Sequence, residues 1–312
     1  ICNEKCWRYY QLKLPKMMKP KNLYSFLLSF LIVPFSANIG ITLFSLSSDT
    51  ALFTKEAKAT NWNAFKLNFD KGYRSLNKGN YQKALEYLNK AIKNYALDGP
   101  TYYNRGNAYM GLEKYQEAIK DYLRSIELDS DTGNQYAYNN IAVSYENLGD
   151  YKNAIKYINL AIKAYPKSGL YFENRGSYNL ELEKFKQAEK DLEEAGKVYL
   201  KYKNTRMYED CPKNKKLIHC QMDSWYYNDL GWAKENLGDL KGALENYNKA
   251  IEINYPNEEK YIWFNNRGNI KYELGDEKGA CKDYKFAASI GDEEGIEWLN
   301  SRDGKWCKKM KL

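Results

Sequence analysis

Residues 104–128, NRGNAYMGLEKYQEAIKDYLRSIEL, and residues 228–253, NDLGWAKENLGDLKGALENYNKAIEI, decide the fold. Each stretch has small residues at three shared positions, which are Gly106, Ala118 and Ser125 in the first and Gly231, Ala243 and Ala250 in the second. Two helices cross closely only where a side chain is absent or small, because a larger one would overpack the crossing. Each stretch therefore predicts a hairpin of two helices.

The same pattern recurs along the chain with a period of about 34 residues. Its middle position is held by Ala84, Ala118, Ala154, Ala188, Ala243 and Ala280, at spacings of 34, 36, 34, 55 and 37. Large residues between the small ones fall at helical spacing on the face that must be buried, which predicts a packed core. The spacing of 55 predicts an insertion between the fourth and fifth units.

The turns between the predicted helices pair a glycine with Asn or Asp, at Gly79-Asn80, Gly149-Asp150, Gly238-Asp239 and Gly275-Asp276. A left-handed glycine ends the first helix and an Asn or Asp side chain caps the second. These units resemble tetratricopeptide repeats (TPR), over about residues 65–290. The resemblance implies an all-α fold, a right-handed solenoid of six helix-turn-helix repeats with a C-terminal capping helix at Glu293 to Asn300. The junction after the sixth repeat resembles a Sel-like repeat.

The predicted organisation has three parts. Residues 1–59 form a leader, residues 60–303 the repeat domain, and residues 304–312 a C-terminal tail. The six repeats cover about 65–98, 99–132, 135–168, 169–202, 224–257 and 261–292, with a lysine-rich insertion at about 199–222. The second helix of the fourth repeat is expected to continue through GKVYLKYK.

An uncharged apolar run at about 22–48 follows three lysines and indicates a segment directed to a membrane. Ala57-Lys58-Ala59 offers a cleavage site for a signal peptide, whereas the length of the run approaches that of a membrane span. Both alternatives place the repeats on the extracytoplasmic side (periplasm, lumen or outside the cell), secreted after cleavage or anchored with the N-terminus in the cytoplasm. Residues 1–16 are expected to precede the true start at Met17 or Met18.

The formal charge of +8 is concentrated in the leader, which leaves 40 basic and 37 acidic residues, or +3, for residues 60–312. Binding to a nucleic-acid backbone needs a concentrated basic stripe, so nucleic acid is not the expected partner. No glycine-rich phosphate loop follows a strand pattern. His219, Cys211 and Cys220 lack a fourth ligand for zinc. We expect no metal, no cofactor and no catalysis.

An extracytoplasmic location favours disulfides between nearby cysteines. Cys211 with Cys220 would close the insertion, and Cys281 with Cys307 would tie the tail to the last repeat. The alternative for Cys281 is a buried thiol that acts as a small apolar side chain.

In the resembled family the first helices line a concave groove, and the residue two before the Gly or Ala faces it. Here that file is Asp70, Asn104, Asn140, Asn174, Asp229 and Asn266. Amides offer both donor and acceptor, so the file is similar to the asparagine ladder that grips extended peptides in the TPR domain of O-linked N-acetylglucosamine transferase. The alternative is that these residues only space the repeats. Neighbouring candidates for the groove are Asn107, Asn228, Asn269, Trp225, Trp232, Tyr103 and Tyr272.

The sequence thus predicts a non-catalytic scaffold that binds an extended peptide or protein segment in the groove. The alternative is an assembly or tethering factor for a membrane complex that uses the convex face and the insertion. The two-carboxylate clamp of chaperone-binding repeats needs Lys and Arg at positions that hold Phe69 and Tyr73 here, so we do not expect that kind of partner.

Overall fold

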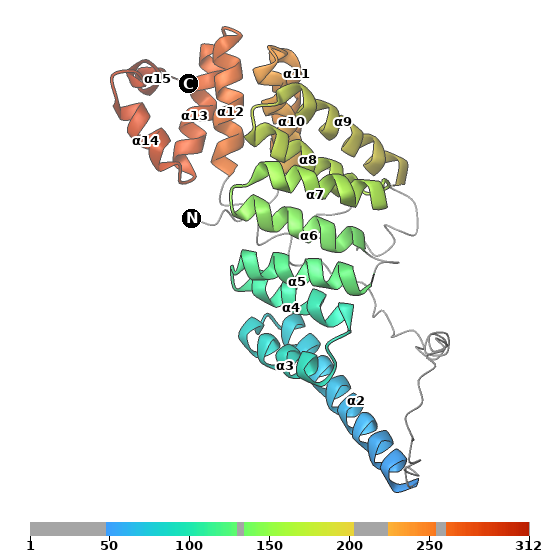
Figure 1. Ribbon diagram of the computed structural model, residues 1–312. Coiled ribbons are helices and arrows are strands. Elements are labelled where there is room, and N and C mark those ends of the chain that lie inside the picture. Colours follow the sequence, from blue (N-terminus) through green and yellow to red (C-terminus); the bar gives the residue numbers. More distant parts are fainter. Residues whose placement is uncertain (1–47, 130–133, 203–223, 254–259, 312) are drawn as a thin grey trace. The chain divides into compact units, whose positions relative to one another are not determined.

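The computed structural model describes residues 48–129, 134–202, 224–253 and 260–311, apart from the side chains of residues 48–60 and of residue 202. Every regular element in these ranges is helical, as the fold class predicted. The helices form two compact units, α2 to α5 in unit 1 and α6 to α15 in unit 2. Each unit is built from consecutive helix pairs (Figure 1).

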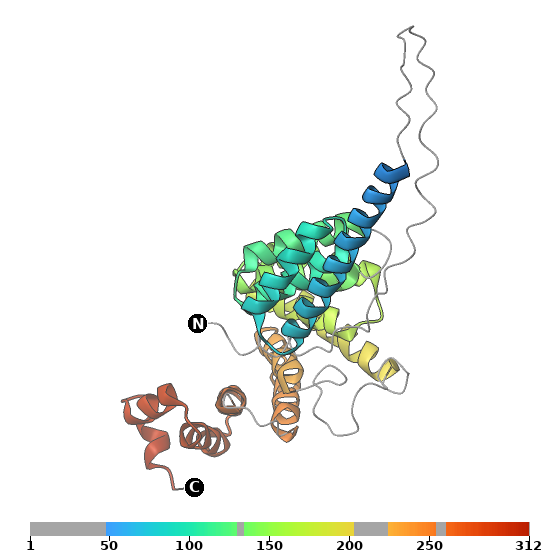
Figure 2. The same cartoon turned by 90° about the horizontal axis from the view of Figure 1, so that it is seen from below.

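Unit 1 contains two pairs. The first is α2 (Ser48–Asn77) with α3 (Tyr81–Asn94), and the second is α4 (Gly99–Gly111) with α5 (Tyr115–Leu128). Helix α2 is 30 residues long and crosses the predicted boundary between leader and repeats at residue 59 without a break. Its N-terminal turns project beyond α3 in Figures 1 and 2.

Unit 2 contains four pairs: α6 (Asn134–Asn147) with α7 (Tyr151–Ala164), α8 (Gly169–Glu181) with α9 (Phe185–Tyr202), α10 (Ser224–Asn236) with α11 (Leu240–Glu252), and α12 (Lys260–Glu273) with α13 (Glu277–Ser289). Helix α9 continues through GKVYLKYK to Tyr202, as predicted. The predicted capping helix is α14 (Glu293–Asn300). The predicted tail contains a further short helix, α15 (Lys305–Lys309).

The small residues lie where paired helices meet. All six alanines of the repeating middle position are fully buried. A Cβ atom placed on Gly106 would stand 2.7 Å from Cε1 of Tyr122, and one on Gly231 would stand 2.7 Å from Cε1 of Tyr247. Because such contacts are impossible, glycine at these crossings is what allows a ring to fill the space between the helices.

The large residues behave differently on the two helices of a pair. The second-helix residues Leu88, Tyr122, Ile158, Leu192 and Tyr247 are fully buried, as predicted. The sixth residue of that set, Tyr284, is only half-buried, so its prediction as core was wrong. On the first helix, the aromatic residues four positions before the small residue at the crossing (Gly106 in the second repeat) are only half-buried. The prediction that they belong to the buried core was therefore wrong. Those residues are Tyr102, Tyr138, Phe172, Tyr227 and Phe264.

The turns follow the predicted chemistry with one exception. Gly79, Gly149, Gly238 and Gly275 all have positive φ, between 72° and 85°. Asp150, Asp239 and Asp276 accept a hydrogen bond from the backbone N–H three residues later, whereas the Asn80 side chain makes no cap. Glu113 and Glu183 occupy the left-handed position in the second and fourth repeats, with φ of 58° and 56°.

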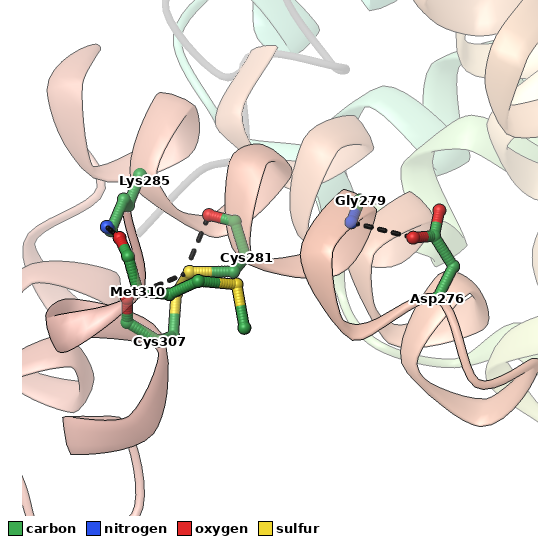
Figure 3. Close-up of a disulfide and its surroundings, with 6 residues drawn as sticks. All are labelled: Asp276, Gly279, Cys281, Lys285, Cys307 and Met310. Carbon is green, nitrogen blue, oxygen red and sulfur yellow. Dashed lines mark hydrogen bonds between the residues drawn. A yellow bond between two sulfur atoms is a disulfide. The ribbon is translucent and has the colours of Figure 1, made fainter. Parts of the chain in front are cut away.

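The end of unit 2 is closed by a covalent bond. Cys281 of α13 and Cys307 of α15 form a disulfide, and both residues are fully buried (Figure 3). Nζ of Lys285 donates a hydrogen bond to the carbonyl oxygen of Met310 at 2.9 Å. These contacts hold the C-terminal segment against the last helix pair.

None of the described helices is long and apolar enough to cross a membrane. Residues 22–47 of the predicted apolar segment lie outside the described residues, and so does the predicted pair Cys211 and Cys220.

We expect Gly106→Ala to lower the free energy of unfolding by about 1–3 kcal/mol, because the new methyl group would collide with the ring of Tyr122. In the third repeat, Ala142 and Ile158 hold the positions of Gly106 and Tyr122, and both belong to one hydrophobic cluster. Adding Tyr122→Ile to Gly106→Ala should therefore recover part of the loss. Urea unfolding of the four members of this cycle measures the coupling, and strictly additive effects would contradict the proposed contact.

We also expect Glu113→Gly to raise the free energy of unfolding by about 0.5–1 kcal/mol, because glycine adopts positive φ without a steric penalty. The matched control is Glu117→Gly, the same change within α5. It should destabilise the protein by about 1 kcal/mol. Equal effects of the two substitutions on the urea midpoint would show that the turn is not strained.

Candidate functional site

The first helices of unit 2 are joined by side-chain hydrogen bonds. Nδ2 of Asn174 in α8 donates to Oδ1 of Asn139 in α6 at 3.0 Å. Nδ2 of Asn266 in α12 donates to Oδ1 of Asn228 in α10 at 2.9 Å. Between these two links, Oγ of Ser177 in α8 donates to Oδ2 of Asp229 in α10 at 2.6 Å. The bonds place α6, α8, α10 and α12 side by side.

Three residues of the predicted file, Asn174, Asp229 and Asn266, take part in these links. Asn174 and Asp229 are buried, and Asn140 and Asn266 are half-buried. In unit 1, Asn104 is also buried. The contacts favour a spacing role for Asn174 and Asp229, which was the alternative reading of the file. Contact of any of these amides with a peptide stays a prediction.

Two of the neighbouring predicted amides accept hydrogen bonds from tyrosines of their own repeat, whereas Asn228 accepts from Asn266. Oδ1 of Asn107 accepts from the Tyr122 hydroxyl at 2.8 Å, within the core of unit 1. Oδ1 of Asn269 accepts from the Tyr284 hydroxyl at 2.9 Å at an exposed position. Burial raises the pKa of Tyr284 to about 12, so this hydroxyl stays a donor at neutral pH.

Exposed aromatic side chains flank the linked residues. Tyr136 stands three residues before Asn139, and Trp232 three residues after Asp229, so each lies on the same side of its helix as the linked residue. Tyr136 and Trp232 are 42% and 36% exposed. Tyr272 is 50% exposed, and its ring lies 5.5 Å from that of Trp306 in α15. Trp225 is half-buried, with its ring 6.0 Å from that of Trp263. We call the side chains of α6, α8, α10 and α12 around the inter-helix bonds the first-helix face.

Carboxylates of the first-helix face are held by tyrosine hydroxyls. Glu146 accepts from Tyr178 at 3.0 Å, Glu173 from Tyr199 at 2.6 Å and Glu235 from Tyr247 at 2.6 Å. Burial raises the pKa of Glu235, the bond from Tyr247 lowers it, and the charge of Glu273 raises it further. Glu235 and Glu273 therefore act on each other as like charges.

A recurring arginine network, absent from the sequence predictions, braces the first helices from behind. The guanidinium of Arg105 donates to Asp121 at 2.6 and 2.7 Å and to Asn89 of the preceding repeat at 2.7 Å. Arg175 makes the equivalent bonds to Asp191 and Asn159, and Arg267 to Asp283 and Asn248. Burial raises the pKa of the Asp121 carboxyl, and Arg105 opposes that shift.

Each of these arginines also lies over an aromatic ring three residues earlier, at 5.3 to 5.5 Å from the ring centroid. Tyr138 and Tyr227 at the same position of the third and fifth repeats are half-buried as well, without an arginine. The sequence contains a signal for the network. In the second, fourth and sixth repeats an Arg stands directly before the glycine of the first helix, and an Asp stands sixteen residues after that Arg.

Within the described ranges, no three His, Cys, Asp or Glu side chains are grouped so that they could hold a metal ion. His219 lies outside these ranges.

Comparison with known proteins agrees with the helix pairs. Models of the tetratricopeptide repeat match residues 100–131 and residues 65–96, 136–168 and 226–257. No curated protein matches the sequence.

Solved structures with the same arrangement include YrrB, described as a TPR protein with an unusual peptide-binding site, at 21% identity and a TM-score of 0.52, over 70% of this chain and all of that one. PilF of Pseudomonas aeruginosa has 16% identity and a TM-score of 0.55, over 81% of this chain and all of that one. MamA of Desulfovibrio magneticus RS-1 has 19% identity and a TM-score of 0.50, over 61% and 94%. At these identities the likeness shows the fold alone. From the repeat matches and this shared fold, we conclude that the chain contains tetratricopeptide repeats.

Proposed function

We propose that this protein is a non-catalytic scaffold whose first-helix face in unit 2 binds an extended segment of another protein. The observation that carries the proposal is the row of four linked first helices with exposed aromatic side chains beside the links. Aromatic side chains supply much of the binding energy of protein interfaces. YrrB, which shares the fold, is described as having a peptide-binding site.

The residues of the file contribute to this function in two ways. The buried Asn174 and Asp229 keep neighbouring first helices in register, and the half-buried amides of Asn140 and Asn266 retain partial access to a ligand. An extended peptide presents N–H and C=O groups that such amides can pair with. The aromatic side chains then supply contact area, while the amides fix the position of the ligand backbone.

We also propose that the repeats reside outside the cytoplasm. The disulfide between Cys281 and Cys307 supports this location, because structural disulfides persist in oxidising compartments and are rare in the cytosol. The proposed location does not depend on whether the leader is cleaved or retained.

A photo-crosslinking amino acid in place of Trp232 tests the binding face, and the same substitution at Leu160 is the control. Leu160 lies on the second helix α7 and is 36% exposed, as Trp232 is. In cells that produce the full chain, we expect a discrete adduct from position 232 and none from position 160. The same adduct from both positions, or an adduct from position 160 alone, would reject the first-helix face and favour the tethering alternative.

Once the crosslinked partner is identified, Trp232→Ala combined with Tyr272→Ala should weaken its binding to the purified protein at least about tenfold. Leu160→Ala should leave the affinity unchanged. An unchanged urea midpoint in each variant shows that the fold is retained. Unaltered affinity in the double variant would mean that these rings are not part of the interface.

Alkylation of thiols after cells are quenched with acid and the protein is denatured tests the compartment, because denaturation exposes both buried cysteines. We expect Cys281 and Cys307 to resist a maleimide until a reductant is added, and mass spectrometry of the digested protein measures this. Labelling of both cysteines before reduction would refute an oxidising location.

A further inference from the structure

A row of large apolar side chains runs beside the inter-helix bonds of the first-helix face. Each first helix of the face has such a residue three or four positions before the residue that forms the bond, which places it one helical turn away on the same side. We call this set the apolar row. Its members are Tyr136 in α6, Leu170 in α8, Trp225 in α10 and Ile262 in α12.

The helix pairs do not require the apolar row. The first helices of unit 1 have Lys66 and Pro100 at the same position, six residues before the small residue at the crossing, and they form helix pairs nonetheless. No member of the row is fully buried, because Tyr136 is 42% exposed and the other three side chains are half-buried. The row therefore keeps apolar surface that a ligand can contact.

Contacts beneath the row hold its side chains in place. Leu170 packs against the hydrophobic cluster that contains Ile158. The ring of Trp225 lies 6.0 Å from that of Trp263, which is fully buried. Side chains that are already ordered lose little conformational entropy when a ligand binds. The row thus has the properties of a preformed contact surface.

The interval between neighbouring members of the row limits the kind of segment that fits. Packed helices lie about 8–10 Å apart, and the side-chain bonds join each first helix of the face to the next. Members of the row occupy equivalent positions on these helices, so their interval follows that of the helices. A segment that contacts all of them needs apolar side chains on one side of its chain at about the same interval.

Polyproline II is the extended conformation that matches this interval. It has three residues per turn and rises about 3.1 Å per residue, so every third side chain lies on the same side, about 9 Å farther along. In a β-strand, side chains on one side are about 7 Å apart, or about 13 Å apart if one is skipped. Polyproline II segments also bind in grooves lined with aromatic residues, and the row contains Tyr136 and Trp225.

We infer that the segment bound by the first-helix face is proline-rich and adopts polyproline II, with an apolar side chain at every third residue. This inference rests on the proposed function and adds the conformation and the side chains of the partner. The apolar side chains of the segment contact the apolar row. A polyproline II backbone has no internal hydrogen bonds, so its carbonyl oxygens can accept from the half-buried amides of Asn140 and Asn266.

Three labelled peptides of equal length test the inference, and fluorescence anisotropy measures their binding to the purified full chain. The first has leucine at every third position and proline at all others. The second has the same composition, but its leucines stand at every second position. The third has alanine in place of the prolines of the first. We expect the first peptide to bind at least about tenfold more tightly than the second. The third should bind more weakly than the first, because alanine does not fix the backbone in advance.

Substitutions in the row locate the contact. Tyr136→Ser with Ile262→Ser should weaken binding of the first peptide about tenfold. The control is Leu148→Ser with Leu274→Ser, in the turns that follow the same two helices, where both leucines are 42% exposed. The control should change the affinity by less than about twofold. Urea midpoints verify the fold, and if the row pair is destabilised, Tyr136→Ser alone is compared with Leu148→Ser.

Equal affinity for the first two peptides, or tighter binding of the second, would overturn the inference, because the spacing of the leucines would then not matter. An alanine peptide that binds as tightly as the first would exclude a role for polyproline II. Equal losses in the row variant and its control would place the contact elsewhere. Absence of binding by all three peptides also counts against the inference. In that case a specific adduct from position 232 would still support the proposed function, so the two failures are distinguishable.

Discussion

The close approach of paired helices at glycine and alanine is the constraint on which the structure depends. Where Gly106 faces Tyr122, and where Gly231 faces Tyr247, a single methyl group would collide with the ring. The ring fills the space that the missing side chain leaves, so the two helices pack closely. Because every repeat meets this requirement with its own small and large residues, one short pattern generates the successive helix pairs.

The arginine network groups the repeats two by two. Arg105, Arg175 and Arg267 each join an even-numbered repeat to the odd-numbered repeat before it, through Asn89, Asn159 and Asn248. The third and fifth repeats have Ile141 and Leu230 at the arginine position. The junctions without an arginine coincide with the division between units 1 and 2 and with the predicted insertion. The pair of repeats joined by an arginine is therefore the structural module, although the pattern of small residues recurs in every single repeat.

The helix pairs, the crossing residues and the glycine turns were predictable because each follows from a local pattern with a single steric cause. The role of the amides was harder to predict. Asn174 bonds with Asn139 across repeats, and no pattern within one repeat distinguishes a spacing amide from a binding amide. The half-burial of Tyr102, Phe172 and Phe264 was missed because helical spacing shows which side of a helix a residue lies on, but not how far its ring extends out of the core.

Helix α2 has a consequence for whatever lies ahead of the repeats. Its partner α3 is 14 residues long, and the ring of Trp62 packs against Tyr95 at the far end of that helix. The turns of α2 before Trp62 therefore have no second helix beside them within the pair. At about 1.5 Å per residue, residues 48–61 measure roughly 20 Å from end to end. Such a rod acts as a spacer, which sets a minimum distance between the first repeat and anything attached at Ser48.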